Sequence, residues 1–138
     1  MKIIGIILFW MLGTGLSSAQ VNNDSLTSYL RYVNVAESHF KQKEYGKCAI
    51  FYSLAFVTMG GQGKVTDRYR AASCWALSNN VDSAFAQLNR IADKGKYMNL
   101  DECLNDPAFI VLHSDKRWQP LISVIERNVK EALLNSKQ

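Results

Sequence analysis

Apolar residues in the middle of the chain follow a helical spacing that repeats after 36 residues. In each copy, six apolar positions are separated by steps of three and one, which places them on a single helix face. The first copy contains Tyr45, Cys48, Ala49, Tyr52, Ala55 and Phe56, and the second contains Val81, Ala84, Phe85, Leu88, Ile91 and Ala92. Upstream, the same shift aligns Val33, Ala36 and Phe40 with Tyr69, Ala72 and Ala76. The pattern predicts two units, each a pair of helices.

Turn-forming and capping residues divide the two units into four expected helices. They span Leu26 to Lys41, Tyr45 to Thr58, Thr66 to Ser78 and Val81 to Asp93. Asp24 or Ser25 is expected to cap the first and Thr66 the third, because their side-chain oxygens accept hydrogen bonds from amides of a first turn. The glycines of "MGGQGK" (59–64) are expected to end the second helix. No segment alternates long enough to predict a strand, so the expected fold is all-α, with two helical hairpins stacked as a short α-solenoid.

Small side chains are expected to set the distance between these helices. Alanine or cysteine recurs where backbones must approach closely, and larger side chains fill the space beside them. The expected packing residues are Ala36, Cys48, Tyr52, Ala55, Phe40, Ala72, Trp75, Ala84 and Leu88.

The C-terminal segment 96–138 is expected to cover the end of the stack. Asp106 and Pro107 favour the start of a short helix that presents Phe109, Ile110 and Leu112. Asp115 is expected to cap a last helix whose apolar positions are Trp118, Leu121, Ile122, Ile125, Val129 and Leu133. "LHSDKRWQPL" (112–121) is thus interpreted as a plug with Trp118 facing inward and Lys116 and Arg117 at its rim. The alternative is a ligand site.

The first 19 residues resemble a secretory signal. Lys2 precedes an apolar run from Ile3 to Leu12, and Ser17-Ser18-Ala19 provides a small-x-small cleavage pattern. A membrane anchor is the alternative, although the run is shorter than the roughly 18 to 20 residues needed to span a bilayer. The predicted organisation is a signal peptide (1–19), a linker (20–25), two hairpins (26–60 and 65–95) and the capping segment. Secretion or a periplasmic location follows, with no stable membrane insertion after cleavage.

Cysteine count and charge limit the classes of function. Cys48, Cys74 and Cys103 are an odd number in an oxidising compartment, and their spacing fits no zinc or redox motif. We interpret Cys48 as a buried small residue, while one disulfide among the three stays open. The net charge of +4 comes without a run of Lys and Arg, so nucleic acid is not an expected partner.

The residues of both units resemble the tetratricopeptide pattern. In the first unit the pattern falls on Ala36, Tyr45, Cys48 in place of the usual alanine, Tyr52 and Ala55, with Gly60 where the family often has proline. The second unit and the tail resemble the module that ends groups of such repeats in secreted bacterial proteins, of the Bacteroidetes-like kind. The matching residues are Tyr69, Ala71, Ala72, Trp75, Ala76, Leu77, Ala84, Phe85, Leu88, Gly95, Leu100, Asp106, Pro107, Leu112, Asp115, Arg117 and Trp118. The resemblance covers roughly residues 30 to 127.

This resemblance implies that the leading helices line a concave face that holds an extended peptide. Carried over position by position, the partner-binding residues would be Val33, Glu37, Phe40, Lys41, Tyr69, Ser73 and Leu77. The lining is mixed and lacks the cluster of Lys and Arg that would bind a peptide carboxylate, so no class of peptide is indicated.

Sequence motifs for catalysis, cofactors or metals are not found. "GGQGKVT" (60–66) departs from a phosphate-binding loop at both its first glycine and its last hydroxyl position. His39 and His113 are far apart in sequence, and Asp101, Glu102 and Asp106 are interpreted as turn and cap residues. We therefore expect no catalytic, cofactor-binding or metal site, and a non-catalytic protein that binds a protein or peptide.

The alternative is an accessory or regulatory module of an enzyme whose catalytic domain lies on another chain or is missing here, because modules like this one often precede a catalytic domain. Small-molecule or metal binding is a third interpretation.

Overall fold

The structure, a computed structural model, describes the backbone from residue 18 to 137 and the side chains from residue 23. The elements in order are α1 (Ser18–Lys41), α2 (Tyr45–Thr58), α3 (Val65–Leu77), α4 (Val81–Asp93), α5 (Leu100–Asn105), the 3-10 helix η1 (Pro107–Leu112) and α6 (Trp118–Asn135). No strand occurs in residues 18–137, and the all-α prediction is confirmed. All but the last two residues of the expected signal peptide lie outside the described part of the chain. None of the helices from residue 18 onward combines the length and apolar content that crossing a bilayer requires.

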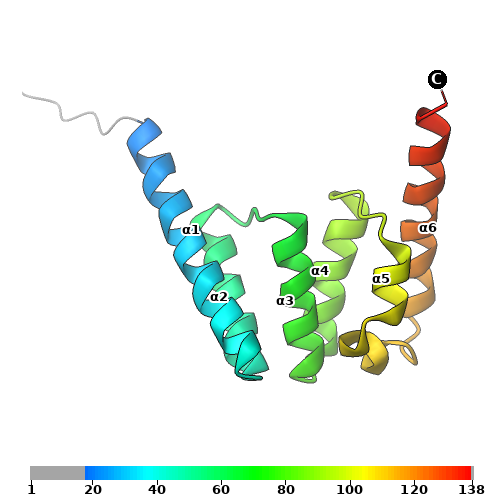
Figure 1. The fold of residues 1–138 in the computed structure, drawn as a ribbon, viewed down its shortest axis with the longest axis horizontal. Coiled ribbons are helices and arrows are strands. Elements are labelled where there is room, and N and C mark those ends of the chain that lie inside the picture. The colour runs from blue at the N-terminus through cyan, green and yellow to red at the C-terminus, as the bar shows by residue number, and fades with distance from the viewer. Residues whose placement is uncertain (1–17, 138) are drawn as a thin grey trace, which may run out of the picture.

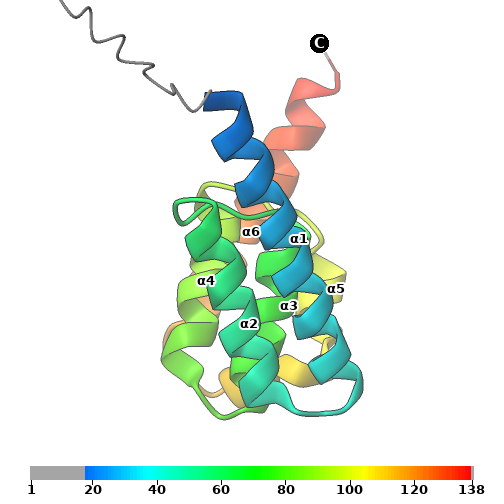
Figure 2. The ribbon, with the colours of Figure 1, turned by 90° about the vertical axis from the view of Figure 1, so that its left-hand side faces the viewer.

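The helices form two antiparallel pairs followed by a terminal group (Figure 1). α1 packs on α2 and α3 packs on α4, while α2 and α3 join the two pairs. α5 and η1 contact each other, η1 contacts α3, and α6 packs against α4 and α5. Figure 2 shows α1, α3 and α5 on one side of the molecule and α2 and α4 on the other.

The 36-residue repeat seen in the sequence is present in the backbone. α2 and α4 begin at matching positions, and five of the six repeated positions are buried in each helix. The turns before them match as well, because Lys43 and Asn79 both have positive φ, at 59° and 61°. In both turns the next residue donates its amide to a carbonyl five residues back, Glu44 to His39 and Asn80 to Trp75. This is the usual way to end a helix with one left-handed residue.

Two hydrophobic clusters meet at Trp75, which packs against both. One lies within the first hairpin and reaches Ala71 and Cys74 of α3. The other joins the second hairpin to the C-terminal segment. The expected packing residues are buried, except that Trp75 and Phe40 are only partly so.

A disulfide joins the two hairpins. Cys48 of α2 and Cys74 of α3 are bonded, with their Cα atoms 6.0 Å apart and neither side chain exposed. The interpretation of Cys48 as simply a small buried residue is therefore incomplete, because packing of α2 on α3 brings it against a second cysteine. Cys103 is a buried free thiol, and burial raises its pKa to about 12.

α1 begins eight residues earlier than expected, and the caps expected for α1 and α3 are wrong. α1 begins at Ser18, so Asp24 and Ser25 lie inside the helix and segment 20–25 is not a linker. α3 begins at Val65 without a side-chain cap, which leaves Thr66 within its first turn. Tyr29 instead fixes this corner, because its hydroxyl donates to Asp67 and accepts from the Lys64 amide at 3.1 Å.

The loop between the hairpins depends on its glycines. Gly60 and Gly61 have φ of 61° and 80°, a region that side chains disfavour. A Cβ on Gly63 would lie 2.5 Å from the Phe56 ring. The loop can therefore lie close to the end of α2.

The C-terminal segment covers the second hairpin much as expected. Trp118 is 6% exposed and packs in the cluster with Phe109 and Leu112, which confirms that it faces inward. Asp106 caps η1 by accepting from the Ala108 amide at 2.9 Å. Ile110 is 66% exposed, contrary to expectation, because η1 is a 3-10 helix in which residues three apart share a face. Leu133 is also exposed.

Candidate functional site

The residues expected on the partner-binding face lie along α1 and α3 but differ in accessibility. Val33, Glu37 and Phe40 are partly buried, and Lys41 and Leu77 are exposed. Tyr69 is 8% exposed and Ser73 only 1%, and the Ser73 hydroxyl donates to the carbonyl of Tyr69. Ser73 therefore does not belong to the surface, because the close packing of α3 covers it.

Glu37 is the centre of a polar contact between α1, α2 and α3. It accepts from the Tyr52 hydroxyl, and Arg70 Nε lies 3.3 Å from its Oε1. The Arg70 guanidinium also lies over the Phe40 ring, 4.4 Å from the centroid. Burial, and then the hydrogen bond to Glu37, raise the pKa of Tyr52, so its phenol remains a donor. This contact holds Arg70 at the surface with further N–H groups free to bind.

Arg70 also lines a groove of about 270 Å³ between α3 and α5. We call it the tyrosine groove; its lining residues are Val65, Thr66, Tyr69, Arg70, Tyr97, Glu102 and Asp106. Tyr69 donates to Asp106 at 2.9 Å, Tyr97 donates to Glu102 at 2.7 Å, and the two rings lie 5.4 Å apart. The pKa values of both phenols are raised, mainly by burial and then by the carboxylates.

The tyrosine groove therefore offers two kinds of polar contact beside aromatic surface. Glu102 and Asp106 each keep free lone pairs, since a carboxylate accepts about four hydrogen bonds. Arg70 supplies donors at the same groove, and Thr66 is exposed beside it. Such a surface can bind the alternating N–H and C=O groups of an extended chain.

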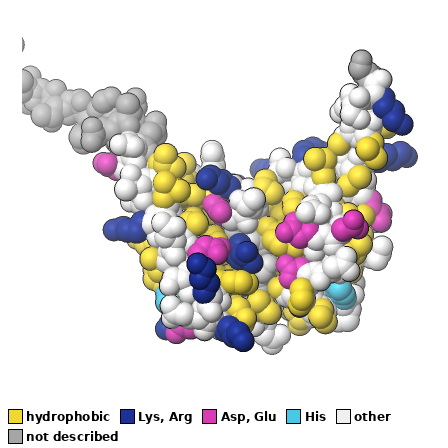
Figure 3. Space-filling view, in the orientation of Figure 1, with side chains coloured by type: hydrophobic (Ala, Val, Ile, Leu, Met, Phe, Trp, Pro, Cys, Tyr) yellow, Lys and Arg dark blue, Asp and Glu magenta, His cyan; other side chains and the backbone are white. Residues whose placement is uncertain are grey.

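Figure 3 shows the face that carries α1, α3 and α5. Acidic and basic side chains are interspersed there with hydrophobic ones, without a large patch of one charge. No three His, Cys, Asp or Glu residues from residue 23 onward are grouped so that they could hold a metal ion.

Of the residues that line the tyrosine groove, the sequence pattern predicts only Tyr69 as a binding residue. The pattern indicates turn and cap roles for Glu102 and Asp106, and it does not indicate binding by Thr66, Arg70 or Tyr97. Asp106 does cap η1, yet its second oxygen accepts from Tyr69. The signal in the sequence is the cluster of charged and aromatic residues around 97–106.

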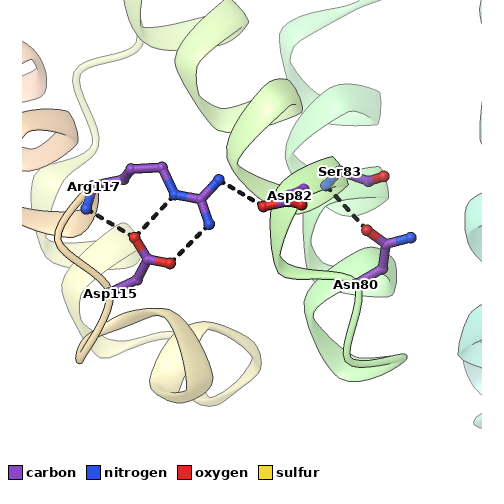
Figure 4. Close-up of polar contacts among 5 residues, drawn as sticks. All are labelled: Asn80, Asp82, Ser83, Asp115 and Arg117. Carbon is purple, nitrogen blue, oxygen red and sulfur yellow. Dashed lines mark hydrogen bonds and ion pairs between the residues drawn. The ribbon is translucent and has the colours of Figure 1, made fainter.

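A second polar cluster, at Arg117, fixes the C-terminal segment to α4 (Figure 4). Arg117 donates to Asp115 through Nε at 2.9 Å and through Nη2 at 2.7 Å, and to Asp82 at 2.7 Å. Its guanidinium lies 4.4 Å from the centroid of Phe85. Hydrogen bonds from Arg117 lower the pKa of Asp115 to about 2. The cluster is therefore structural, and Arg117 lies at the rim of the plug, as expected, where it joins the C-terminal segment to α4.

In comparisons with known proteins, the chain matches no protein-family model, no curated protein and no solved structure.

Proposed function

We propose that this chain is a non-catalytic helical-repeat protein that binds an extended segment of a partner protein in the tyrosine groove. The resemblance of the N-terminus to a secretory signal supports a location outside the cytoplasm, in the periplasm or secreted. The tetratricopeptide resemblance of the sequence supports the assignment of the leading helices as the binding side. The observation that carries the proposal is the groove itself, in which donors and acceptors lie beside two tyrosine rings.

The contacts in the groove define how the partner would be held. Backbone amides of the extended segment donate to Glu102 and Asp106, and a backbone carbonyl accepts from Arg70. An apolar or aromatic partner side chain packs on the rings of Tyr69 and Tyr97. Because these contacts use mainly the partner's backbone, they favour an extended conformation more than a particular sequence.

Selection from a library of displayed peptides, followed by calorimetry on the selected peptides, tests the proposal. Thr66→Arg would fill the groove from an exposed position, so it should abolish binding without unfolding the chain. Ala86→Arg is the matched control, because Ala86 is an exposed residue of α4, on the other side of the molecule. The proposal fails if no peptide is selected, or if the two variants bind equally well.

Affinity isolation from the envelope fraction with the same variants tests for a protein partner. A partner recovered with the wild type and with Ala86→Arg, but lost with Thr66→Arg, would support the tyrosine groove as its site. An enzyme as that partner would favour the accessory-module alternative.

A further inference from the structure

Three cationic side chains line a second cavity, which shares only Val65 with the tyrosine groove. The cavity has a volume of about 220 Å³ and lies between the α2–α3 loop, the first turns of α3 and the end of α4. Arg68, Arg90 and Lys94 line it, together with Gln62 and Gly63 of the loop.

The two arginines converge on one neutral atom. Arg68 donates through Nη2 to the carbonyl oxygen of Gly61 at 2.5 Å, and Arg90 donates to the same oxygen at 3.1 Å. Arg68 also donates to Gln87 at 2.7 Å and lies 4.3 Å from the centroid of the Phe56 ring. Gly61 and Gln87 accept hydrogen bonds from the arginines, but neither they nor the Phe56 ring carry a negative charge.

No carboxylate compensates this charge within the described part of the chain. Arg68, Arg90 and Lys94 form no ion pair there, although Asp67 and Asp93 are their sequence neighbours. Asp67 instead accepts from Tyr29. Arg68 is only 6% exposed, and a buried charge is costly unless a counter-charge accompanies it. Burial and the nearby Arg90 lower the pKa of Arg68, in agreement with this repulsion.

The fold of a hairpin does not itself require cations at these positions. By the 36-residue shift, Arg90 and Lys94 of α4 correspond to Leu54 and Thr58 of α2. α2 forms the same helix with the same buried face, although these two residues are uncharged. Packing of the hairpin therefore does not account for the cations at positions 90 and 94.

We propose that this cavity binds a phosphate-type oxyanion, either inorganic phosphate or the phosphate group of a monoester. Arginine presents several N–H donors in a planar fork that matches phosphate oxygens, and lysine adds a point charge. A dianion between Arg68, Arg90 and Lys94 would supply the missing counter-charge. It would add a contact between α3 and the end of α4 where Arg68 and Arg90 already bind the loop through Gly61.

Calorimetric titration of the full chain with inorganic phosphate and with phenyl phosphate, at constant ionic strength, tests this proposal. We expect saturable binding of at least one of them; similar affinities would indicate a site for the phosphate group, and preference for phenyl phosphate a site for a monoester. Arg90→Gln combined with Lys94→Gln should weaken binding at least about tenfold. The matched control, Arg127→Gln with Lys130→Gln, removes the same charges from exposed positions of α6 and should bind like the wild type.

Absence of saturable binding, or equal weakening in both double variants, would overturn the proposal. Amide resonances in the wild type give a second measurement that does not depend on the variants. Phosphate should shift those of Gly63 and Gly95, which line the cavity, and leave the end of α6 unchanged. Peptide binding in the tyrosine groove should persist in Arg90→Gln with Lys94→Gln, which separates this proposal from the proposed function.

Discussion

Removing the disulfide between Cys48 and Cys74 should destabilise the protein strongly. The bond closes a loop with a sequence separation of 26 residues. Such a crosslink lowers the conformational entropy of the unfolded chain. In the chain-entropy description, this raises the free energy of unfolding by about 3.5 kcal/mol at 25 °C. The loss is large against the roughly 5 to 15 kcal/mol that stabilise an ordinary domain.

Urea unfolding of the wild type with and without reductant measures this effect. With a slope of about 1.5 to 2 kcal/mol per molar, the midpoint should fall by about 2 M. Cys48→Ala with Cys74→Ala should resemble the reduced wild type and should no longer respond to reductant. Cys103→Ala is the control, because Cys103 is a free thiol and its variant should keep the full response. A wild type with three reactive thiols when unfolded under non-reducing conditions, or with a midpoint insensitive to reductant, would refute the reasoning.

Three further predictions concern packing and the Arg117 cluster. Trp118→Ala should cost about 3 to 5 kcal/mol of stability, because it empties a buried aromatic position; an unchanged thermal midpoint would contradict the plug. Ala84→Leu should cost about 1 to 3 kcal/mol by overpacking a fully buried site, whereas Ala86→Leu on the exposed face of α4 should be nearly neutral in urea unfolding. The depressed pKa of Asp115 implies that its stabilisation is complete above its usual pKa of 3.8 and disappears as the pH falls towards about 2. Asp115→Asn should therefore flatten the loss of stability across that pH range, and an unchanged acid profile would argue against the ion pair with Arg117.

The helices and their buried faces were predictable from the sequence because the pattern is local. The spacing of Cys48, Tyr52 and Ala55 indicates one face of a helix. The same spacing recurs 36 residues later, which supports the prediction a second time. The glycine loop was equally clear. The corner before α3 was not, because Tyr29 contacts residues 64 and 67 there, which are far away in sequence.

The candidate site was predictable only in part because it depends on contacts between separate elements. Glu37 was identified from its position on α1, but its partners Arg70 and Tyr52 come from two other helices. Tyr97 and Glu102 belong to a segment without the repeat, so no periodic pattern pointed to them. The pairing of Cys48 with Cys74 follows only from the packing of α2 against α3, because the sequence alone allows any two of the three cysteines to pair.

The position of the disulfide also affects what proteolysis could do to this molecule. Cys48 precedes the glycine loop at 59–64 and Cys74 follows it. A protease that cut this loop would thus produce two polypeptides that stay covalently linked and migrate separately only after reduction. In an oxidising environment, nicking at this loop would not release either half.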